Sequence, residues 1–259
     1  MSEPVSAPLL EVRGLVKRFG GLVATADLAL DVLDGEVHAV IGPNGAGKTT
    51  LIGQLSGDLR PDAGTIRFAG EDITHLGAAA RSMRGLARSF QITSVFRDFT
   101  ALDNVALAVQ AHADHSFHFW RRARGEPELR APARAALTRV GLAHRADAIV
   151  ANLSHGEHRQ LEIAMALATA PRMLLLDEPM AGMGPEESAR MVKLLRELKA
   201  EVTILLIEHD MEAVFALADR ITVLVYGRVI ATGAPEAIRA NAEVRQAYLG
   251  DSDAVAGHA

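Results

Sequence analysis

A glycine-rich loop between an apolar segment and a helical segment constrains the fold of this chain more than any other feature. The loop spans residues 42–49, reads G-P-N-G-A-G-K-T and follows the apolar run Val37–Ile41. It matches the pattern G-x-x-x-x-G-K-[ST], whose structural context is a strand before the loop and a helix after it. We therefore expect a strand over Val37–Ile41 and a helix from Lys48 to about Leu55.

The composition of this loop suits the binding of phosphate groups. Glycines let backbone N–H groups curl around phosphate oxygens, and the helix N-terminus adds a positive field. Lys48 would reach the terminal phosphates and Thr49 would hold magnesium. A glycine-rich turn is the alternative, but turn chemistry does not call for lysine and threonine at those positions. The predicted nucleotide-binding residues of this segment are Gly42, Pro43, Asn44, Gly45, Ala46, Gly47, Lys48, Thr49 and Thr50.

Two adjacent carboxylates, Asp177 and Glu178, follow a second apolar run, Met173–Leu176. Open parallel sheets bind ligands at the carboxyl ends of their strands. Asp177 would orient magnesium, commonly through a water molecule, and Glu178 would face the attacking water as a general base. An acidic turn at a strand end is the alternative. Two carboxylates after three leucines fit hydrolysis better than binding alone.

The order of strand-like and helix-like segments indicates an α/β fold. Short strands with turn signals surround the phosphate loop in the N-terminal part. Residues 93–168 show apolar positions at three- and four-residue spacing, which predicts an inserted helical subdomain. From Met173 to Val225, apolar strands alternate with helices, which predicts a parallel sheet with crossover helices.

Composition argues against several classes of function. The net charge of -5 disfavours a nucleic acid partner, because phosphate binding normally leaves a basic footprint. The chain has no cysteine, so disulfides, thiolate metal sites and cysteine nucleophiles are impossible. Its N-terminal residues lack the features of a signal peptide, and no apolar run approaches the roughly 18 residues of a membrane span. A role at a membrane would therefore come through a partner.

A third motif lies ahead of the apolar run that begins at Leu161. Residues 153–157 read L-S-H-G-E and resemble the LSGGQ signature of ABC ATPases. Ser154 followed three residues later by Glu157 is also a capping box for a helix N-terminus. Both interpretations hold together, because exposed N–H groups at a helix N-terminus suit a γ-phosphate. The resemblance implies that Ser154, His155, Gly156 and Glu157 contact nucleotide held by a second subunit, in a head-to-tail dimer.

Three further elements of the ABC family occur in the expected order. Phe19 resembles the aromatic residue that stacks on adenine, although a core phenylalanine at a strand end is the alternative. Gln91, after R-S-F, resembles the glutamine that senses magnesium and water. His209, in I-E-H-D, resembles the switch histidine that contacts the γ-phosphate. The resemblance implies catalytic roles for Glu178, His209 and Gln91, with magnesium held by Thr49, Gln91 and Asp177.

With these motifs the resemblance covers nearly the whole chain and implies an ABC cassette. Such a cassette has a P-loop NTPase core of the RecA-like type, an N-terminal antiparallel β subdomain and an inserted helical subdomain. Its cofactors would be ATP and Mg²⁺. The expected divisions are residues 1–91 and 167–250 for the core with its β subdomain, 92–166 for the helical subdomain and 251–259 for a flexible tail.

Some positions depart from the family pattern. Gln160 and Met165 stand where many members carry arginines, so structural ion pairs cannot be carried over to them. Gly184 stands where the loop after Glu178 normally has an aspartate that reaches across the dimer. If the chain pairs with a different ATPase, we expect the two sites to be unequal.

The glycine- and methionine-containing loop at 180–184, the run L-E-I-A at 161–164 and the ending V-R-Q-A-Y-L-G at 244–250 resemble ATPases of branched-chain amino acid uptake. The resemblance implies two membrane permease subunits, a second ATPase subunit and an external solute-binding protein. A homodimer is the alternative to a pair of different ATPases, and related systems carry urea, amides or aromatic acids. The chain would lie in the cytoplasm, peripheral on the inner face of the membrane.

The segment from His112 to Arg134 contains His112, His115 and His118 beside aromatic residues and several arginines. A metal site, a surface insertion and a docking surface for permease or lipid headgroups are all open interpretations.

Other classes of ATPase fit less well. Soluble ABC proteins of DNA repair carry long coiled coils, and those of translation usually carry two cassettes, whereas this chain has one phosphate loop and no sustained heptads. A GTPase or small-molecule kinase would lack the L-S-H-G-E motif, and no N-K-x-D guanine motif is present.

We expect Lys48→Ala to abolish tight ATP binding, because the ammonium group supplies charge-assisted contacts to the terminal phosphates. The loss should be roughly 10- to 100-fold in affinity or more. Titration calorimetry of the purified chain with ATP measures it, and Lys193→Ala on the predicted helix Pro185–Leu198 is the control. Unchanged affinity in the Lys48 variant would contradict a phosphate-binding loop.

Overall fold

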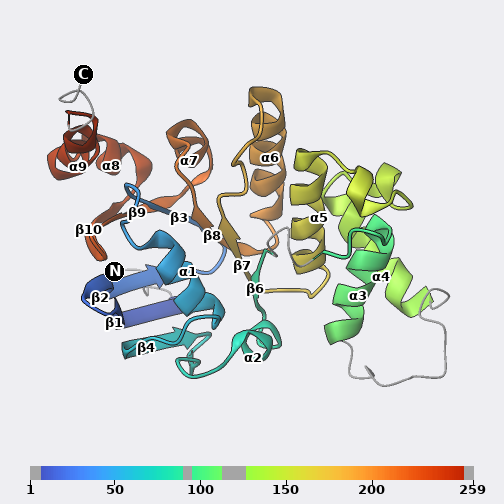
Figure 1. Ribbon diagram of the computed structural model, residues 1–259, viewed down its shortest axis with the longest axis horizontal. Coiled ribbons are helices and arrows are strands. Elements are labelled where there is room, and N and C mark those ends of the chain that lie inside the picture. The colour runs from blue at the N-terminus through green and yellow to red at the C-terminus, as the bar shows by residue number, and fades with distance from the viewer. Residues whose placement is uncertain (1–6, 90–94, 113–126, 254–259) are drawn as a thin grey trace, which may run out of the picture.

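The computed structural model describes residues 7–89, 95–112 and 127–253, with side chains described as far as residue 247. Two sheets and a group of helices share one chain (Figure 1). Helices α3, α4 and α5 form one end of the molecule, and α8 and α9 lie at the opposite end.

The larger sheet has six strands in the order β10-β9-β3-β8-β7-β6. Its strands β6, β7, β8, β3 and β9 are parallel to one another, and β10 is antiparallel to β9. Strands β3 and β8 are buried along their whole length, which explains why their sequences are almost continuously apolar. The bounds are β3 Val37–Ile41, β6 Leu86–Arg88, β7 Met173–Asp177, β8 Thr203–Ile207, β9 Arg220–Val225 and β10 Arg228–Gly233.

The smaller sheet is antiparallel, in the order β2-β1-β4-β5. Its apolar face joins α1 and one face of the larger sheet in a shared core, which includes Leu10, Leu15, Leu51 and Phe68. The core therefore holds the helix after the phosphate loop between the two sheets. The bounds are β1 Leu10–Phe19, β2 Leu22–Val32, β4 Ala63–Phe68, β5 Glu71–Asp72 and α1 Lys48–Ser56.

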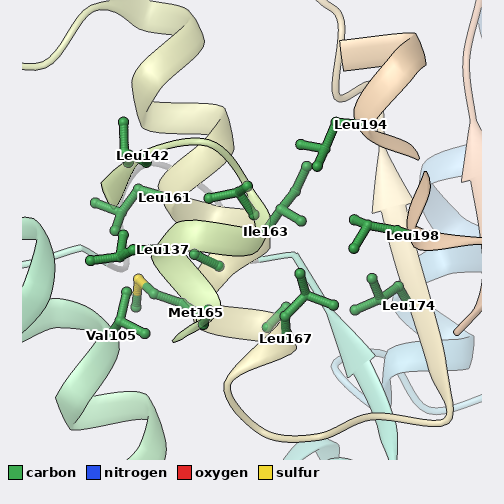
Figure 2. Close-up of a cluster of buried hydrophobic side chains, with 14 of the residues drawn as sticks. Val105, Leu137, Leu142, Leu161, Ile163, Met165, Leu167, Leu174, Leu194 and Leu198 are labelled. Carbon is green, nitrogen blue, oxygen red and sulfur yellow. The ribbon is translucent and has the colours of Figure 1, made fainter. Parts of the chain in front are cut away.

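Helix α5 (His155–Leu167) connects the helical end of the molecule to the sheet. Figure 2 shows Val105, Leu137 and Leu142 on one side of α5, and the pair Leu194 and Leu198 on the other. All these residues belong to one cluster of buried side chains that continues into the sheet. A shift of α5 would therefore disturb packing on both sides, because such interiors are close-packed. The neighbouring helices are α3 Ala101–His112, α4 Pro127–Arg139 and α6 Pro185–Leu198.

Some strands are longer than the sequence predicts, and other strands and helices are not predicted by it. Strands β1 and β2 are longer than expected and form a hairpin with irregular register, in which polar residues near the turn remain exposed. Strands β5, β6 and β10 and helices α2, α8 and α9 were not expected. The remaining helices are α2 Ala78–Ser82, α7 Met211–Leu217, α8 Pro235–Ala240 and α9 Ala242–Asp253. Within the described residues, no helix has both the length and the apolar character to cross a membrane.

Candidate nucleotide-binding and catalytic site

The phosphate loop lies between the end of β3 and the start of α1, as expected. Two of its glycines approach neighbouring backbone too closely for any side chain. A Cβ on Gly42 would lie 2.1 Å from the carbonyl oxygen of Leu224, and one on Gly47 would lie 2.2 Å from that of Ala24. Gly47 is also the N-cap of α1 with a φ of 102°, in the left-handed region that favours glycine.

The hairpin between β9 and β10 is joined to this loop by a backbone hydrogen bond. The Gly227 N–H donates to the carbonyl of Ala46 at 2.9 Å, and the Ala26 N–H donates to the carbonyl of Gly227 at 2.9 Å. The hairpin therefore links the phosphate loop to β2. This contact fixes the loop backbone from outside the motif, through residues about 180 positions later in the chain.

Lys48 is buried and points into its own loop. Its Nζ donates to the carbonyl oxygens of Gly42 at 2.6 Å and Pro43 at 3.0 Å. Burial lowers the pKa of Lys48, and the negative charges of Glu178 and Asp177 oppose this shift. The structure thus brings the lysine of the loop within electrostatic reach of both predicted carboxylates, although 129 positions separate Lys48 from Asp177 in the sequence.

Asp177 is the last residue of β7 and pairs in register with Ile207 of β8. Burial raises the pKa of Asp177, while the nearby Arg88 guanidinium acts in the opposite direction. Arg88 Nη2 lies 3.1 Å from Asp177 Oδ2, and Arg88 Nη1 lies 2.9 Å from Asp58 Oδ2. Sequence analysis did not single out Arg88.

Glu178 and His209 lie next to each other at the ends of β7 and β8. Glu178 has a φ of 49°, unusual for a residue with a side chain, and its N–H donates to the Ile207 carbonyl at 2.9 Å. Its Oε1 lies 3.7 Å from His209 Nδ1, and both side chains are exposed. Such backbone strain is found most often at functional sites. Both side chains are accessible to a ligand.

Glu208 holds the backbone on both sides of these residues, and sequence analysis missed its role. Its carboxylate is 1% exposed. Its Oε1 accepts from the N–H of Met180 at 2.9 Å, and Oε2 accepts from the N–H groups of His209 at 3.0 Å and Asp210 at 3.4 Å. One buried acidic side chain thereby fixes the loop after Glu178 and the turn that carries His209. An acidic residue before the histidine was the only available sequence signal.

The L-S-H-G-E motif forms the N-terminus of α5. Ser154 is the N-cap, and both hydrogen bonds of the capping box are present: Glu157 N–H to Ser154 Oγ at 3.2 Å, and Ser154 N–H to Glu157 Oε2 at 2.8 Å. His155 Nε2 lies 2.9 Å from the carbonyl oxygen of Ala181, and Arg145 Nε lies 3.0 Å from Glu157 Oε1. The side chains of His155 and Glu157 are therefore engaged within this chain, while Ser154 is exposed.

The remaining predicted positions lie as follows. Phe19 is 49% exposed at the end of β1, which disfavours the core alternative, and Lys17 Nζ lies 5.7 Å from its ring centroid. Thr49 is exposed in the first turn of α1, next to the half-buried Thr50. Gln91 lies outside the described residues.

The residues that depart from the family pattern have local partners. Gln160 Nε2 donates to the Val140 carbonyl at 2.8 Å, and Met165 is buried in the core. Gly184 is the N-cap of α6, where its N–H approaches Glu187 Oε2 at 3.4 Å.

The segment from His112 to Arg134 is only partly described, and its His115 and His118 lie outside the described residues. His112 Nε2 lies 3.0 Å from Ser82 Oγ. In the part of the chain that the structure describes, no group of three acidic, histidine or cysteine side chains could hold a metal ion alone.

Comparison with known proteins relates this geometry to a family. A family model described as ABC transporter matches residues 25–181, and one described as branched-chain amino acid ATP-binding cassette transporter matches residues 228–254. The high-affinity branched-chain amino acid transport ATP-binding protein BraF of Pseudomonas aeruginosa is 41% identical over 255 residues, which cover 96% of this chain and 100% of BraF. LivG of Escherichia coli, described in the same words, is 39% identical with the same coverage.

Solved structures agree with the sequence matches. A nucleotide-free ATP-binding cassette from an ABC transporter superposes with a TM-score of 0.83 at 30% identity, covering 93% of this chain and 98% of that one. The ADP conformation of an ATP-binding cassette of an ABC transporter gives a TM-score of 0.84 at 30% identity, covering 95% of this chain and 100% of that one.

We expect Glu208→Gln to destabilise the fold while leaving ATP binding intact. The amide keeps one acceptor and presents its NH₂ group to N–H donors, so at least one buried N–H loses its partner, at a cost of about 1–3 kcal/mol. Urea unfolding measures the loss, and Glu186→Gln, with a side chain 93% exposed, is the matched control. Equal stability of the two variants would contradict this role of Glu208.

Proposed function

This chain belongs to the ABC transporter family of ATP-binding proteins, and we propose that it energises the import of branched-chain amino acids. A related small polar solute, such as an amide, urea or an aromatic acid, is the alternative cargo. One observation carries the proposal: a phosphate loop, two carboxylates and a histidine meet at the carboxyl ends of three parallel strands, β3, β7 and β8. The match of residues 228–254 to the branched-chain amino acid transporter model supports this cargo.

The described residues fit ATP and magnesium. Gly42 and Gly47 leave a backbone cradle that side chains would fill, Lys48 supplies a cation and Asp177 supplies a carboxylate at a strand end. Phosphate would bind the loop N–H groups and Lys48, and adenine would stack on Phe19. Thr49, Asp177 and Gln91 would hold Mg²⁺, which supplies positive charge that offsets the charge of the phosphates.

Hydrolysis would depend mainly on charge stabilisation and on the orientation of water. Phosphoryl transfer needs little covalent help from a protein. Lys48 would leave the carbonyl oxygens of its own loop and contact the terminal phosphates. Glu178 would orient the attacking water and accept its proton, and His209 would contact the γ-phosphate.

We propose that a second subunit completes the site. The N-terminus of α5 presents the exposed Ser154 and would bind the γ-phosphate held by the opposing phosphate loop. The side chains of His155 and Glu157 are engaged within this chain, so Ser154, Gly156 and backbone N–H groups are the groups that would make this contact. Residues 92–166 would move as a helical subdomain against the core when nucleotide binds, and this movement would require the packing of α5 against α6 to rearrange.

The proposed assembly contains two permease subunits, a second ATPase subunit and a solute-binding protein outside the cell. A different ATPase is the favoured second subunit, and a second copy of this chain is the alternative. The chain would sit on the cytoplasmic face of the membrane through the permease, with no role for nucleic acid. Transport is favoured over DNA repair or translation, because the relatives BraF and LivG are transport proteins and match 96% of this chain.

We expect Glu178→Gln to bind ATP and magnesium but to lose turnover by roughly 100- to 10,000-fold, the usual contribution of a general base. The variant should accumulate as an ATP-bound closed dimer in the complex with its partner subunits. Single-turnover hydrolysis and nucleotide retention after gel filtration measure both effects. His209→Ala should show a milder loss, because it removes a phosphate contact and keeps the base.

Glu186→Gln is the matched control for this experiment, because Glu186 is an exposed acid at the start of α6. Hydrolysis near the wild-type rate in the Glu178→Gln complex would remove Glu178 from the catalytic role. The proposed cargo is tested separately, by ATP-dependent uptake of labelled leucine, urea and amides into vesicles that contain the whole complex.

We expect Ser154→Arg to leave ATP binding to this chain intact and to abolish turnover at the opposing site. The arginine would obstruct the helix N-terminus, and loss of the cap costs about 0.5–2 kcal/mol of stability. Ser154→Gly is the control, because glycine tolerates the N-cap position and adds no bulk. The composite site would be wrong if the arginine variant hydrolysed ATP at the wild-type rate in the full complex.

A further inference from the structure

We propose that Arg88 is a positioning residue for Asp177. Arg88 pairs with the Asp177 carboxylate and neutralises its charge before nucleotide binds, and it releases this carboxylate when magnesium and nucleotide bind. The inference rests on the proposed function of the site, to which it adds a residue with no role assigned above. It also gives Asp58 a role as the second partner of Arg88.

The backbone places Arg88 beside Asp177. Arg88 is the last residue of β6, which runs parallel to β7, and it lies opposite Leu175 in the register. The next residue, Ser89, donates its N–H to the Leu175 carbonyl at 2.9 Å. The guanidinium therefore extends along the same edge of the sheet at which β7 ends in Asp177.

The pair is shielded from solvent more than most of the ion pairs among the described residues. The side chain of Arg88 is 19% exposed and that of Asp177 is 15% exposed, and their atoms are 3.1 Å apart. Partly buried pairs interact more strongly than exposed pairs, because water screens them less. A buried carboxylate without a counterion would be costly, so Arg88 stabilises Asp177 while no metal is present.

Arg88 keeps a partner when Asp177 is withdrawn. Its Nη1 lies 2.9 Å from Asp58 Oδ2, and the same oxygen accepts a hydrogen bond from Ser56 Oγ at 2.7 Å. Asp58 comes shortly after the last residue of α1, the helix that follows the phosphate loop. Its position is therefore fixed relative to that loop. Release of Asp177 would thus leave the guanidinium paired, which avoids a stranded charge in a partly buried position.

Lys48, a cation that would contact the ligand, also has hydrogen-bond partners within the chain. Its Nζ is bound by carbonyl oxygens of Gly42 and Pro43, as Asp177 is bound by Arg88. Both groups that would meet magnesium and phosphate therefore have partners within this chain. A guanidinium and a divalent cation compete for one carboxylate, so the Arg88 contact should weaken magnesium-dependent binding and favour the nucleotide-free state.

The experiment compares binding of a fluorescent ATP analogue to the purified full chain in magnesium and in EDTA. The readout is the ratio of the dissociation constant in EDTA to that in magnesium. Arg88→Gln should raise this ratio roughly threefold to tenfold, as expected for loss of a partly buried ion pair. Removing a competitor for Asp177 strengthens binding with magnesium, and removing a positive charge weakens binding without it.

Two further variants separate this role from a purely structural one. Asp58→Asn should lower the ratio, because Arg88 without its second partner holds Asp177 more firmly. Arg88→Lys keeps the charge but has one nitrogen in place of the two that pair with Asp58 and Asp177, so its ratio should lie between those of the wild type and Arg88→Gln. A structural role would instead weaken binding in both conditions alike and leave the ratio unchanged.

The inference is overturned if Arg88→Gln gives a ratio equal to or below that of the wild type while thermal unfolding shows a folded protein. If Arg88→Gln is unfolded, the ratio of Asp58→Asn decides, and an unchanged or raised value overturns the inference. A wild-type chain that binds no nucleotide would instead refute the proposed function.

Discussion

The close approach of the phosphate loop to two neighbouring strands is the constraint on which the rest of the site depends. Gly42 lies against the carbonyl of Leu224, and Gly47 lies against that of Ala24, so a methyl group at either position would collide with backbone. The loop is consequently fixed between the two sheets before any ligand arrives. Preorganised N–H groups of this kind bind anions without the cost of ordering a loop.

The same site contains a strained backbone at Glu178 and a partly buried charge at Asp177, and both depend on contacts with the surrounding structure. Glu178 has a left-handed φ, which costs of order 1–3 kcal/mol and persists only where neighbouring contacts hold it. Those contacts include the Ile207 carbonyl on one side and the buried Glu208 beneath the next loop. Burial of Asp177 opposes its charge, and Arg88 compensates it. The carboxylates of Asp177 and Glu178 therefore depend on two further charged side chains, the Arg88 guanidinium and the buried Glu208 carboxylate.

The sequence was most informative where the chemistry is local. The phosphate loop, the acidic end of β7 and the capping box of α5 each lie within a few consecutive residues, so spacing alone predicted them. Arg88 was missed because its partner Asp177 is 89 positions away, and pairing across a sheet leaves no local pattern. Strand β10 was missed because it is half-exposed and lacks the apolar run of a central strand.

Two glycines in the loop between Glu178 and α6, Gly182 and Gly184, differ in whether the fold requires a glycine at their positions. Gly182 has a φ of 76° and the His155 ring lies 3.3 Å from the position of a Cβ, so a larger residue there would be strained. Gly184 differs, because its φ of -74° is ordinary and nothing lies within 4 Å of the position of a Cβ. The fold would therefore accept an aspartate at 184, and packing does not explain its absence. The missing carboxylate would instead matter at the proposed interface between subunits, where we expect it to make the two sites of a heterodimer unequal.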